Sequence, residues 1–563
     1  MENKTIARKF KLLAQLMELH GENPFKTKAM ANASFKLDKL PFHIVDKSEK
    51  ELSNEQGIGK STAAKVWELI QTGCMEDLEK LISKTPEGVL EMLTIKGLGP
   101  KKIHSIWHTL NIETLGELYY ACNENRLVEA KGFGLKTQEE IKKAIEFNMA
   151  NQGFVHYAQA EKICLPIYQY LRSALPQDEQ LAFTGDFRRK TEIVNTVTLL
   201  STATKEILLS LVEAHEELIA FNQYENSIQA VHISGLAIYL ISSTADTFFH
   251  DLVYTTGNEA HVQGLERLFN GTIPYAESEE AIYQSAGLPY IEPELREGID
   301  ELERAQTNTL PQLLTYDDIK GSLHNHSTWS DGVHRLEEMA VFCKDTLHLS
   351  YLGICDHSGT AVYAKGLKSD RVLQQWQEID LLNQKLAPFK IFKGIESDIL
   401  GDGSLDYSED ILQGFDFVVA SIHSNLKMDE EKATARLIKA IENPYTTILG
   451  HPTGRLLLSR SGYPIHFEKI IDACAANQVA IEINANPLRL DLDWRWHRYA
   501  MDKGVLLSVN PDAHRVEGFR DMYYGTLVAR KGGVTPDQCL NCFDLEKITH
   551  YFETRKKAHS AIV

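Results

Sequence analysis

The spacing of apolar and polar residues divides the chain of 563 residues into three segments. In residues 1–150 the apolar positions recur with the period of amphipathic helices, and glycine-containing turns separate them, which predicts an all-helical segment. Residues 151–315 mix helical stretches with short β-like runs. From residue 316 onward, short apolar runs alternate with helical stretches, which predicts repeated β/α units in a parallel sheet or barrel. The clearest predicted helices are residues 6–19, 63–72, 89–93 and 141–147, and the clearest predicted strands are residues 196–200, 236–241, 351–354, 390–394, 417–422, 446–449, 479–483 and 505–509.

The composition is that of a globular protein, with 43% hydrophobic and 24% charged residues, and it excludes a disordered or fibrous chain. The charge is uneven: residues 1–150 hold 22 Lys and Arg against 21 Asp and Glu, whereas residues 151–563 hold 37 against 57. This balance argues against a simple basic nucleic-acid binder. The 8 cysteines show no framework spacing, and neither an apolar signal core nor a membrane-length run is present. We therefore expect a cytoplasmic protein without a membrane partner.

A Gly-x-Gly turn occurs three times in the first segment, each time before a predicted helix. Glycine allows positive φ and close approach of the backbone to an outside group, and the free N–H groups of the following helix suit a phosphate. A single Gly-x-Gly turn is explained as well by a helix C-cap as by a phosphate-binding turn. Three turns with the same lysine placement predict helix-hairpin-helix units that bind the DNA backbone without reading its sequence. The predicted DNA-binding residues are Gly57, Gly59, Lys60, Gly97, Gly99, Lys101, Gly132, Gly134 and Lys136.

Metal-ligand residues of the last segment recur at the ends of predicted strands, where a β/α barrel gathers its active site. His324 and His326 have the i, i+2 spacing that places two side chains on one face of a strand, although His-x-His alone is a weak signal. Carboxylates combined with imidazoles suit Mn²⁺, Zn²⁺ or Fe²⁺. We therefore predict a site for two or three divalent metals, with Glu396 able to bridge between them. The nine predicted ligands are His324, His326, Asp331, His357, Glu396, His423, His451, Asp512 and His514.

Several motifs in the first two segments resemble those of family-X DNA polymerases. Residues 23–29, Asn-Pro-Phe-Lys-Thr-Lys-Ala, precede the first glycine turn as in the N-terminal domain of that family. Residues 185–189, Gly-Asp-Phe-Arg-Arg, resemble its nucleotide-binding Gly-Ser-x-Arg-Arg, and residues 254–258 and 287–297 resemble it further along. The resemblance implies an α+β, polymerase-beta-like nucleotidyltransferase domain. It also implies a lyase role for Lys65, because some members form a Schiff base at that position; a solvated surface lysine is the alternative.

The metal ligands of a polymerase are missing from the resembling segment. Nucleotidyl transfer uses two Mg²⁺ about 3.5–4 Å apart, held in this family by three carboxylates. The corresponding positions are Thr196, Thr198 and Tyr239, and Asp186 replaces the family's serine, where it would repel a triphosphate. Hydroxyl groups cannot replace anionic ligands, so we predict that polymerase activity is lost. A surface ion pair is the alternative interpretation of Asp186, Arg188 and Arg189.

The nine-ligand pattern resembles the PHP (polymerase and histidinol phosphatase) domain, an α/β barrel of (βα)₇ type with a trinuclear metal site. The whole chain resembles a bacterial family-X DNA polymerase with a C-terminal PHP domain. The resemblance implies three domains: residues 1–150, 151–315 and 316–563. In such proteins the PHP domain is similar to a Mn²⁺-dependent 3′–5′ exonuclease that sometimes acts at abasic sites. Lys365 and Arg455 lie near ligand-bearing loops and are candidates to clamp phosphate, or else they are ordinary surface residues.

The leading hypothesis is a monomeric DNA-repair nuclease acting on gapped, recessed or single-stranded 3′ ends. An active gap-filling polymerase would need carboxylates that the alignment does not supply. The intact metal ligands disfavour a non-catalytic DNA-binding scaffold. The three DNA-backbone turns disfavour a PHP phosphatase acting on a small phosphomonoester.

Overall fold

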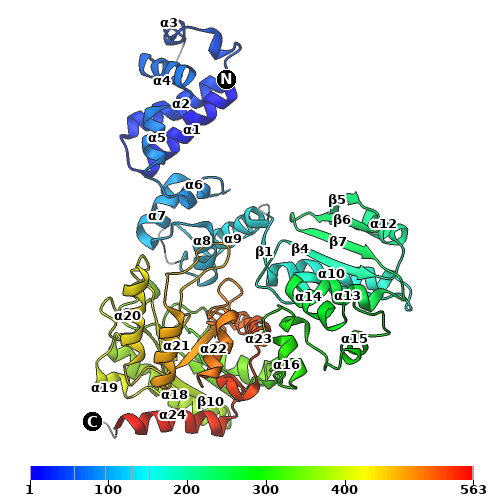
Figure 1. Cartoon of the computed structure of the whole chain (residues 1–563). Coiled ribbons are helices and arrows are strands. Elements are labelled where there is room, and N and C mark those ends of the chain that lie inside the picture. Colours follow the sequence, from blue (N-terminus) through cyan, green and yellow to red (C-terminus); the bar gives the residue numbers. More distant parts are fainter. Residues whose placement is uncertain are drawn as a thin grey trace. The chain divides into compact units, whose positions relative to one another are not determined.

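A computed structural model describes residues 2–55, 58–95, 97–128, 130, 132–150 and 153–560. The chain folds into two compact units, residues 1–146 and 147–563 (Figure 1). Helices dominate the first unit, and the second contains a two-stranded sheet of β1 (Val155–His156) and β3 (Ile193–Val194), a five-stranded sheet and a seven-stranded sheet. In the part of the chain so described, we find no helix long and apolar enough to cross a membrane.

The first unit is helical, as the periodicity predicts. Helix α1 (Asn3–Leu19) buries Ile6, Phe10 and Leu13 on one face, which is the pattern that drives an amphipathic helix against its neighbours. Helix α2 begins where the Asn23 side chain accepts a hydrogen bond from the backbone N–H of Phe25, a typical N-cap. The remaining helices of this unit are α3 (Glu49–Ser53), α4 (Lys60–Thr72), α5 (Glu76–Ile82), α6 (Glu87–Met92), α7 (Pro100–Leu110), α8 (Leu115–Asn123) and α9 (Leu135–Ala150), which continues into the second unit.

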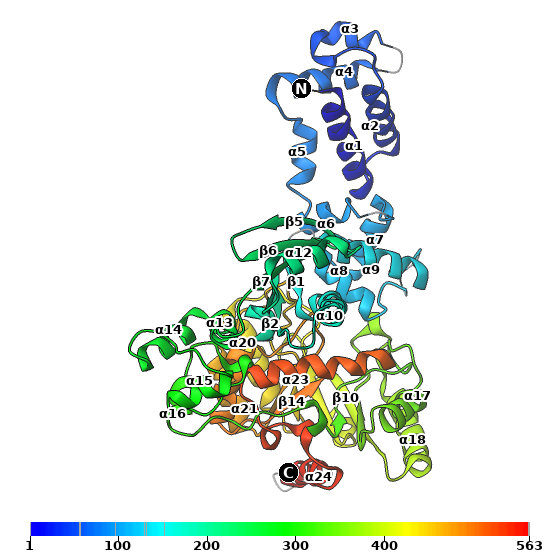
Figure 2. The ribbon, with the colours of Figure 1, turned by 90° about the vertical axis from the view of Figure 1, so that its right-hand side faces the viewer.

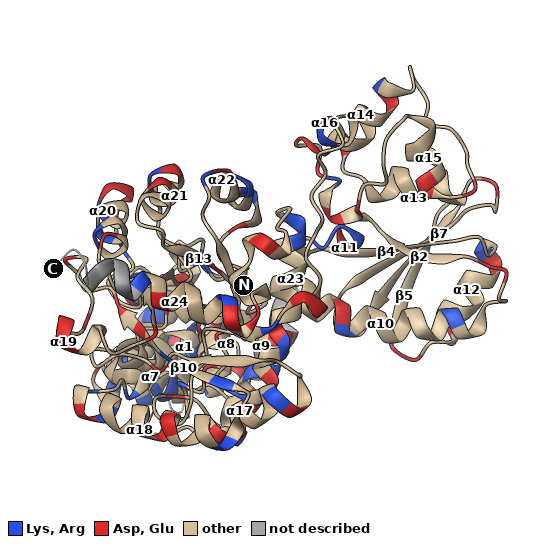
Figure 3. Cartoon of the chain, turned by 90° about the horizontal axis from the view of Figure 1, so that it is seen from below, with Lys and Arg blue, Asp and Glu red and all other residues tan. Residues whose placement is uncertain are grey.

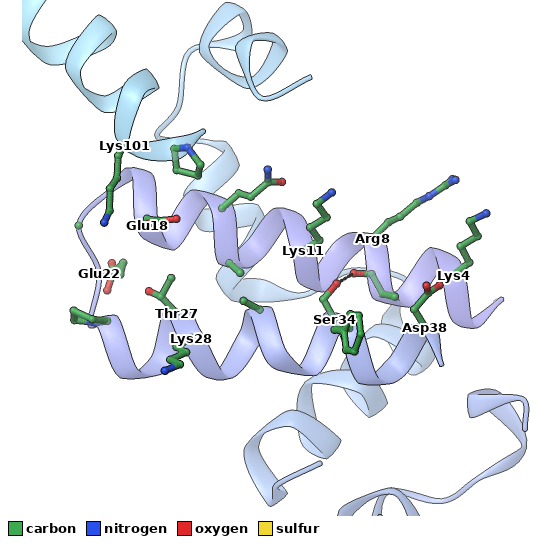
Figure 4. Close-up of a pocket in the computed structure, with 18 residues that line it drawn as sticks. Lys4, Arg8, Lys11, Glu18, Glu22, Thr27, Lys28, Ser34, Asp38 and Lys101 are labelled. Atoms are coloured by element: carbon green, nitrogen blue, oxygen red, sulfur yellow. Dashed lines mark hydrogen bonds between the residues drawn. The ribbon is translucent and has the colours of Figure 1, made fainter. Parts of the chain in front are cut away.

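Helices α1 and α2 (Pro24–Asp38) run antiparallel and enclose a groove of about 920 Å³ (Figure 4). Its walls carry both signs of charge. The cations are Lys4, Arg8, Lys11, Lys28 and Lys101, and the carboxylates are Glu18, Glu22 and Asp38. Because carboxylates stand at both ends of the groove in Figure 4, a continuous polyanion would meet repulsion there.

The five-stranded sheet of the second unit has the order β2-β4-β7-β6-β5. Strand β4 is parallel to β7 and antiparallel to β2, and β6 is antiparallel to β5 and β7. The strands predicted at residues 196–200 and 236–241 are present with bounds shifted by one residue or so. The strands are β2 (Leu181–Thr184), β4 (Thr196–Ser201), β5 (Leu218–Gln223), β6 (Ser227–His232) and β7 (Ala237–Ser242). The helices of this part of the chain are α10 (Tyr157–Ala174), α11 (Gly185–Arg188), α12 (Lys205–Ala214), α13 (Phe248–Thr256), α14 (Glu259–Leu268), α15 (Glu279–Ser285) and α16 (Glu301–Gln306), and the last three belong to a separate hydrophobic core.

The seven-stranded sheet is parallel and follows chain order from β8 to β14. This confirms the predicted repeated β/α units. The strands are β8 (Gly321–Ser322), β9 (Tyr351–Ile354), β10 (Lys390–Asp398), β11 (Phe417–Ser421), β12 (Ile448–Leu449), β13 (Ala480–Asn484) and β14 (Leu507–Asn510), and the larger helices between and after them are α17 (Leu336–Val341), α18 (Ser369–Leu386), α20 (Glu430–Ile441), α21 (Phe467–Ala476), α22 (His497–Asp502), α23 (Met522–Lys531) and α24 (Leu545–Ser560).

The sheet curls until its edge strands nearly meet, and Asn541 fills the remaining gap. The Asn541 side chain accepts from the backbone N–H of Val509 in β14 at 2.8 Å and donates to the carbonyl of Gly321 in β8 at 3.1 Å. Nearer the mouth, the backbone N–H of His326 donates to the carbonyl of Ala513 at 2.9 Å. The result is an almost closed barrel.

Aromatic side chains fill the lower barrel. The Phe417 ring occupies space that only glycine leaves open, because a Cβ added at Gly353 or Gly394 would come within 2.5 Å of it. Phe552 of α24 stacks on Phe417 with centroids 5.1 Å apart, and Figure 2 shows α24 beneath the barrel. Above Gly394, the inward-facing row of β10 continues to Glu396. The barrel interior is therefore filled by apolar side chains in its lower part and by polar side chains at the carboxyl ends of the strands.

Helix α23 joins the barrel to the part of the second unit that holds the five-stranded sheet. Leu527 belongs to the hydrophobic core of the five-stranded sheet, and Arg530 forms an ion pair with Glu294 at 2.8 Å. Acidic and basic residues alternate over barrel helices such as α20, α21 and α22 (Figure 3).

Candidate metal centre and nucleic-acid interface

The structure brings all nine predicted metal ligands together at the mouth of the barrel. Their nitrogen and oxygen atoms form three groups, each within 4.8 Å. The groups are His326, Asp331, His357 and His514; His324, His326 and Asp512; and His357, Glu396 and His423. The ninth residue, His451, reaches Glu396 through Nε2 at 3.1 Å. Because His326 and His357 each belong to two groups, the three groups form one continuous cluster.

Glu396 is the central carboxylate of this cluster. Its Oε1 lies 3.1 Å from His423 Nε2 and 3.3 Å from His324 Nε2, whereas its Oε2 lies 2.9 Å from His357 Nδ1. The two oxygens therefore lie near different histidines of the cluster, as those of a bridging ligand would. The sequence places Glu396 after a strand, but it lies within β10, on the inward-facing row.

Buried carboxylates that the sequence analysis did not single out orient the ligands. Glu482 accepts from His324 Nδ1 at 2.6 Å and from the backbone N–H of His451 at 2.8 Å. Asp398 accepts from His423 Nδ1 at 2.6 Å. A partner of this kind fixes the tautomer and ring orientation of a metal-binding histidine. Glu482 stands among the apolar residues of β13, and that is the signal by which it could be found, whereas Asp398 is the last residue of the more polar β10.

Asp356 orders the loop that carries Asp331. It accepts from the backbone N–H of Ser327 at 2.8 Å, from that of Ser330 at 3.1 Å, and from the Gln375 side chain at 2.6 Å. Because the Asp356 side chain is completely buried, water does not compete for these hydrogen bonds, and they fix the conformation of the loop. Asp331 is thereby aimed at His357 and His514.

The electrostatics of the cluster keep its carboxylates ionised but act on its imidazoles in both directions. Burial opposes the charged forms of His324 and His357, yet Glu482 and Glu396 raise the pKa of His324, and Asp331 and Glu396 raise that of His357. Burial raises the pKa of Glu396, but His423, His324 and His357 outweigh it and hold the pKa well below its usual range. Burial, together with His514 and His357, lowers the pKa of His326 to about 3. An ionised carboxylate and a neutral imidazole are the forms that coordinate a metal.

Several buried polar atoms of the cluster have no hydrogen-bond partner among the described residues. Buried polar atoms are normally satisfied, so such a group calls for an explanation. They include Nε2 of His324, both ring nitrogens of His326, Nδ1 of His357 and Oε2 of Glu396. Divalent metal binding provides that explanation, and the donor set fits it.

The two predicted phosphate clamps lie in different surroundings. Lys365 is exposed on the loop after His357 and has a φ of 58°. Arg455 is largely buried: it donates to Asp493 at 2.6 Å and to the carbonyl of Arg489 at 3.0 Å, and it lies 3.6 Å from Glu192. These partners favour a structural role for Arg455, joining the barrel to the segment before β4.

The glycine turns of the first unit have the geometry of exposed backbone sites. Gly59 and Gly99 are the N-caps of α4 and α7, and Gly134 directly precedes α9. A Cβ added at any of these three would meet open space. Gly97 and Gly132 have φ of 92° and 95°, a conformation that favours glycine.

Lysines accompany these turns at the starts of the helices. Lys60, Lys101 and Lys136 are exposed in the first turns of α4, α7 and α9. Gly57 lies outside the described residues. Lys65 of α4 forms an ion pair with Asp77 and is one-fifth exposed. A lysine nucleophile must lose its proton, so a lyase role would require this ion pair to open.

The three positions at which the resemblance would place polymerase carboxylates lie together on the five-stranded sheet. Thr198 of β4 pairs directly with Tyr239 of β7, and Thr196 is two residues earlier on the same face. Among the described residues, every group of three or more His, Cys, Asp or Glu side chains suited to a metal lies in the barrel.

The two arginines of the nucleotide-binding resemblance are engaged within the protein. Arg188 donates to Glu279 at 3.0 Å and to Thr256 at 2.9 Å. Arg189 donates to Glu297 at 3.0 Å and forms an ion pair with Asp186. Carboxylates within the protein therefore pair with both guanidinium groups.

Two features define the class of this protein: glycine turns that precede helices, and a cluster of metal-ligand residues at the mouth of a barrel. Together they are typical of a DNA-binding protein with a metal-dependent phosphoesterase barrel. Two family models match the first unit: a helix-hairpin-helix domain over residues 1–75 and a SAM-like helix-hairpin-helix tandem over residues 89–146. Both matches agree with the observed turns and support DNA binding.

The chain is 33% identical over 577 residues to the DNA polymerase/3′-5′ exonuclease PolX of Bacillus subtilis (strain 168), an alignment covering 98% of this chain and 100% of the relative. The chain therefore belongs to the bacterial family-X DNA polymerases with a PHP domain. It is also 31% identical over 189 residues to a probable phosphatase of Thermoanaerobacter sp. (strain X514), covering 32% of this chain and 74% of that protein. A probable phosphatase of Caldicellulosiruptor bescii is 36% identical over 142 residues, covering 23% and 55% respectively.

Proposed function

We propose that the nine clustered residues bind two or three divalent cations, Mn²⁺, Zn²⁺ or Fe²⁺. The three overlapping groups of ligand atoms support this number, and the mixture of imidazoles and carboxylates supports these metals. Cations held there would stabilise negative charge on a phosphoryl group under attack. Glu396 holds the groups together, while Glu482 and Asp398 keep His324 and His423 in their ligating orientations.

We further propose that this site hydrolyses DNA from its 3′ end, as a 3′–5′ exonuclease, and acts at abasic sites as an endonuclease. The observation that carries the proposal is the complete ligand cluster in a chain that also presents exposed glycine turns at helix starts. The turns supply DNA-backbone contacts, and Lys365 at the barrel rim is proposed to contact phosphate. Gapped, recessed and single-stranded 3′ ends are the expected substrates.

The test uses the full chain with Mn²⁺ and 5′-labelled oligonucleotides that present each type of 3′ end. Stepwise shortening from the 3′ end is the expected result. A probable-phosphatase relative favours a second candidate, hydrolysis of a small phosphomonoester. Rapid release of phosphate from p-nitrophenyl phosphate, with intact oligonucleotides, would establish that candidate and refute the nuclease.

We propose that polymerase activity is lost, although the PolX relative is named a polymerase. Thr196, Thr198 and Tyr239 at the paired strands β4 and β7 support the proposal, because hydroxyl groups do not replace anionic Mg²⁺ ligands. Extension of a gapped primer with deoxynucleotides and Mg²⁺ or Mn²⁺ would disprove it. The three-domain division at residues 150 and 315, a monomeric state and a cytoplasmic location belong to the same proposal.

A further inference from the structure

The loop after the ligand His357 exposes two apolar side chains, and one of them lies near the cluster of metal-ligand residues. They stand on the turn η5 (Val362–Ala364), where Val362 is 81% and Tyr363 is 38% exposed, whereas Ala364 is buried. The Tyr363 ring centroid lies 6.0 Å from that of the His357 imidazole, with the rings inclined at 60°. An aromatic side chain therefore stands at the rim of the proposed active site.

The base of this loop is fixed to the strands that carry the ligands. The backbone N–H of Leu367 donates to the carbonyl of His357 at 2.8 Å. Gly366 packs so closely that an added Cβ would lie 1.8 Å from the carbonyl oxygen of Ser358. These contacts close the loop onto the strand end that bears His357.

A second set of bonds ties the loop to another ligand. Thr360 donates through its hydroxyl to Asp398 at 2.9 Å, and Asp398 accepts from His423 at 2.6 Å. The same carboxylate thus holds both the loop and a metal-type histidine. Tyr363 is consequently presented at a set position relative to the cluster.

We propose that Tyr363 binds substrate by stacking against the nucleobase next to the scissile phosphodiester. The inference rests on the proposed nuclease function. A phosphodiester bound at the cluster carries its nucleoside toward the rim, where the ring stands 6.0 Å from His357. Stacking of bases on aromatic side chains is tolerant of sequence, because every base has a π-face. Val362 extends the apolar surface of the turn, and exposed Lys365 places a cation next to it.

The first test places the fluorescent base 2-aminopurine at the 3′ end of a single-stranded oligonucleotide whose last linkage is a phosphorothioate that resists hydrolysis, and adds the full chain with Mn²⁺. Stacking on Tyr363 quenches the fluorescence of this base. The local signal is the readout, because the glycine turns contribute affinity elsewhere on the DNA. We expect quenching by the wild type and by Tyr363→Phe, which keeps the ring, and loss of quenching in Tyr363→Ala.

The second test compares Mn²⁺-dependent hydrolysis of two oligonucleotides, one ending in adenosine and one ending in an abasic tetrahydrofuran nucleotide. Tyr363→Ala should raise KM about tenfold on the first substrate, within the range for loss of one stacked base, and less than twofold on the second. Tyr275→Ala is the matched control, because Tyr275 is 65% exposed and lies outside the barrel.

The outcomes separate this inference from the function on which it rests. Equal effects of Tyr363→Ala on both substrates, or quenching that survives in this variant, would overturn the stacking role while leaving the nuclease in place. Absence of hydrolysis by the wild type on either substrate would instead refute the proposed function. A tenfold KM effect confined to the substrate with a base, rescued by Tyr363→Phe, would establish the role.

Discussion

Replacing Glu482 with glutamine tests how strongly a buried partner controls the metal centre. Glu482 Oε1 accepts from His324 Nδ1 at 2.6 Å and from Asn510 at 3.0 Å, and Oε2 accepts from the backbone N–H of His451 at 2.8 Å. A glutamine has one oxygen and one NH₂ group, so in either orientation its NH₂ meets a donor. At least one buried hydrogen bond is therefore lost, at a cost of about 1–3 kcal/mol.

The loss should appear in metal affinity, because partners of ligating histidines typically contribute about 10- to 100-fold. We expect calorimetric titration of the metal-free chain with Mn²⁺ to show this weakening in Glu482→Gln. Glu468→Gln is the matched control, because Glu468 is exposed on α21. A change of less than about threefold in a folded Glu482→Gln protein would refute the reasoning that Glu482 positions His324.

Three further predictions concern closure of the barrel, pH and DNA binding. Asn541→Ala should lower the free energy of unfolding by at least about 2 kcal/mol, because buried groups on Val509 and Gly321 lose their partner; urea unfolding at wild-type stability would contradict this. Burial lowers the pKa of His156 to about 4, so its neutral folded form loses stability as pH falls below its unfolded value of 6.5. Protonation of His156 should lower the free energy of unfolding by about 2 kcal/mol between pH 6.5 and 5. This contribution is excluded if the free energy of unfolding of His156→Gln falls as steeply with pH as that of the wild type. Gly99→Val should leave the melting temperature similar, because the added side chain would enter open space within the protein. The same side chain would stand where the DNA backbone is expected, so DNA affinity in a filter assay should fall about fivefold or more. Unaltered affinity would argue against this turn as a DNA contact.

Sequence patterns predict the barrel well because parallel strands that are buried on both faces form continuous apolar runs. Such runs show no alternation of apolar and polar residues by which the end of a strand could be located. For this reason Glu396 is predicted to follow its strand although it lies within β10. The closure by Asn541 could not be foreseen, since it joins residues far apart in the chain. Local spacing carries no information about such contacts.

The ligands themselves are easier to predict than their supports. His324 and His326 stand out by spacing and type, whereas Glu482 shows its role only through contacts with His324 and His451. A carboxylate in a fully buried strand must be paired, so its presence there signals a site without naming the partner. Arg455 shows how position in the sequence can mislead. Its place near the ligand-bearing loops suggests a phosphate-binding role, but its guanidinium group forms ion pairs with Asp493 and Glu192.

The central claim is that the cluster at the barrel mouth binds the metals that hydrolyse DNA. Its most direct test is Mn²⁺-dependent degradation of 3′-ended DNA by the full-length wild type and by His324→Ala/His326→Ala, with bound metal measured in both proteins. These two imidazoles take part in two of the three ligand groups. The account predicts that the folded double variant loses bound metal and at least about 100-fold in activity. Equal degradation by the two proteins would place the nuclease elsewhere and contradict the account.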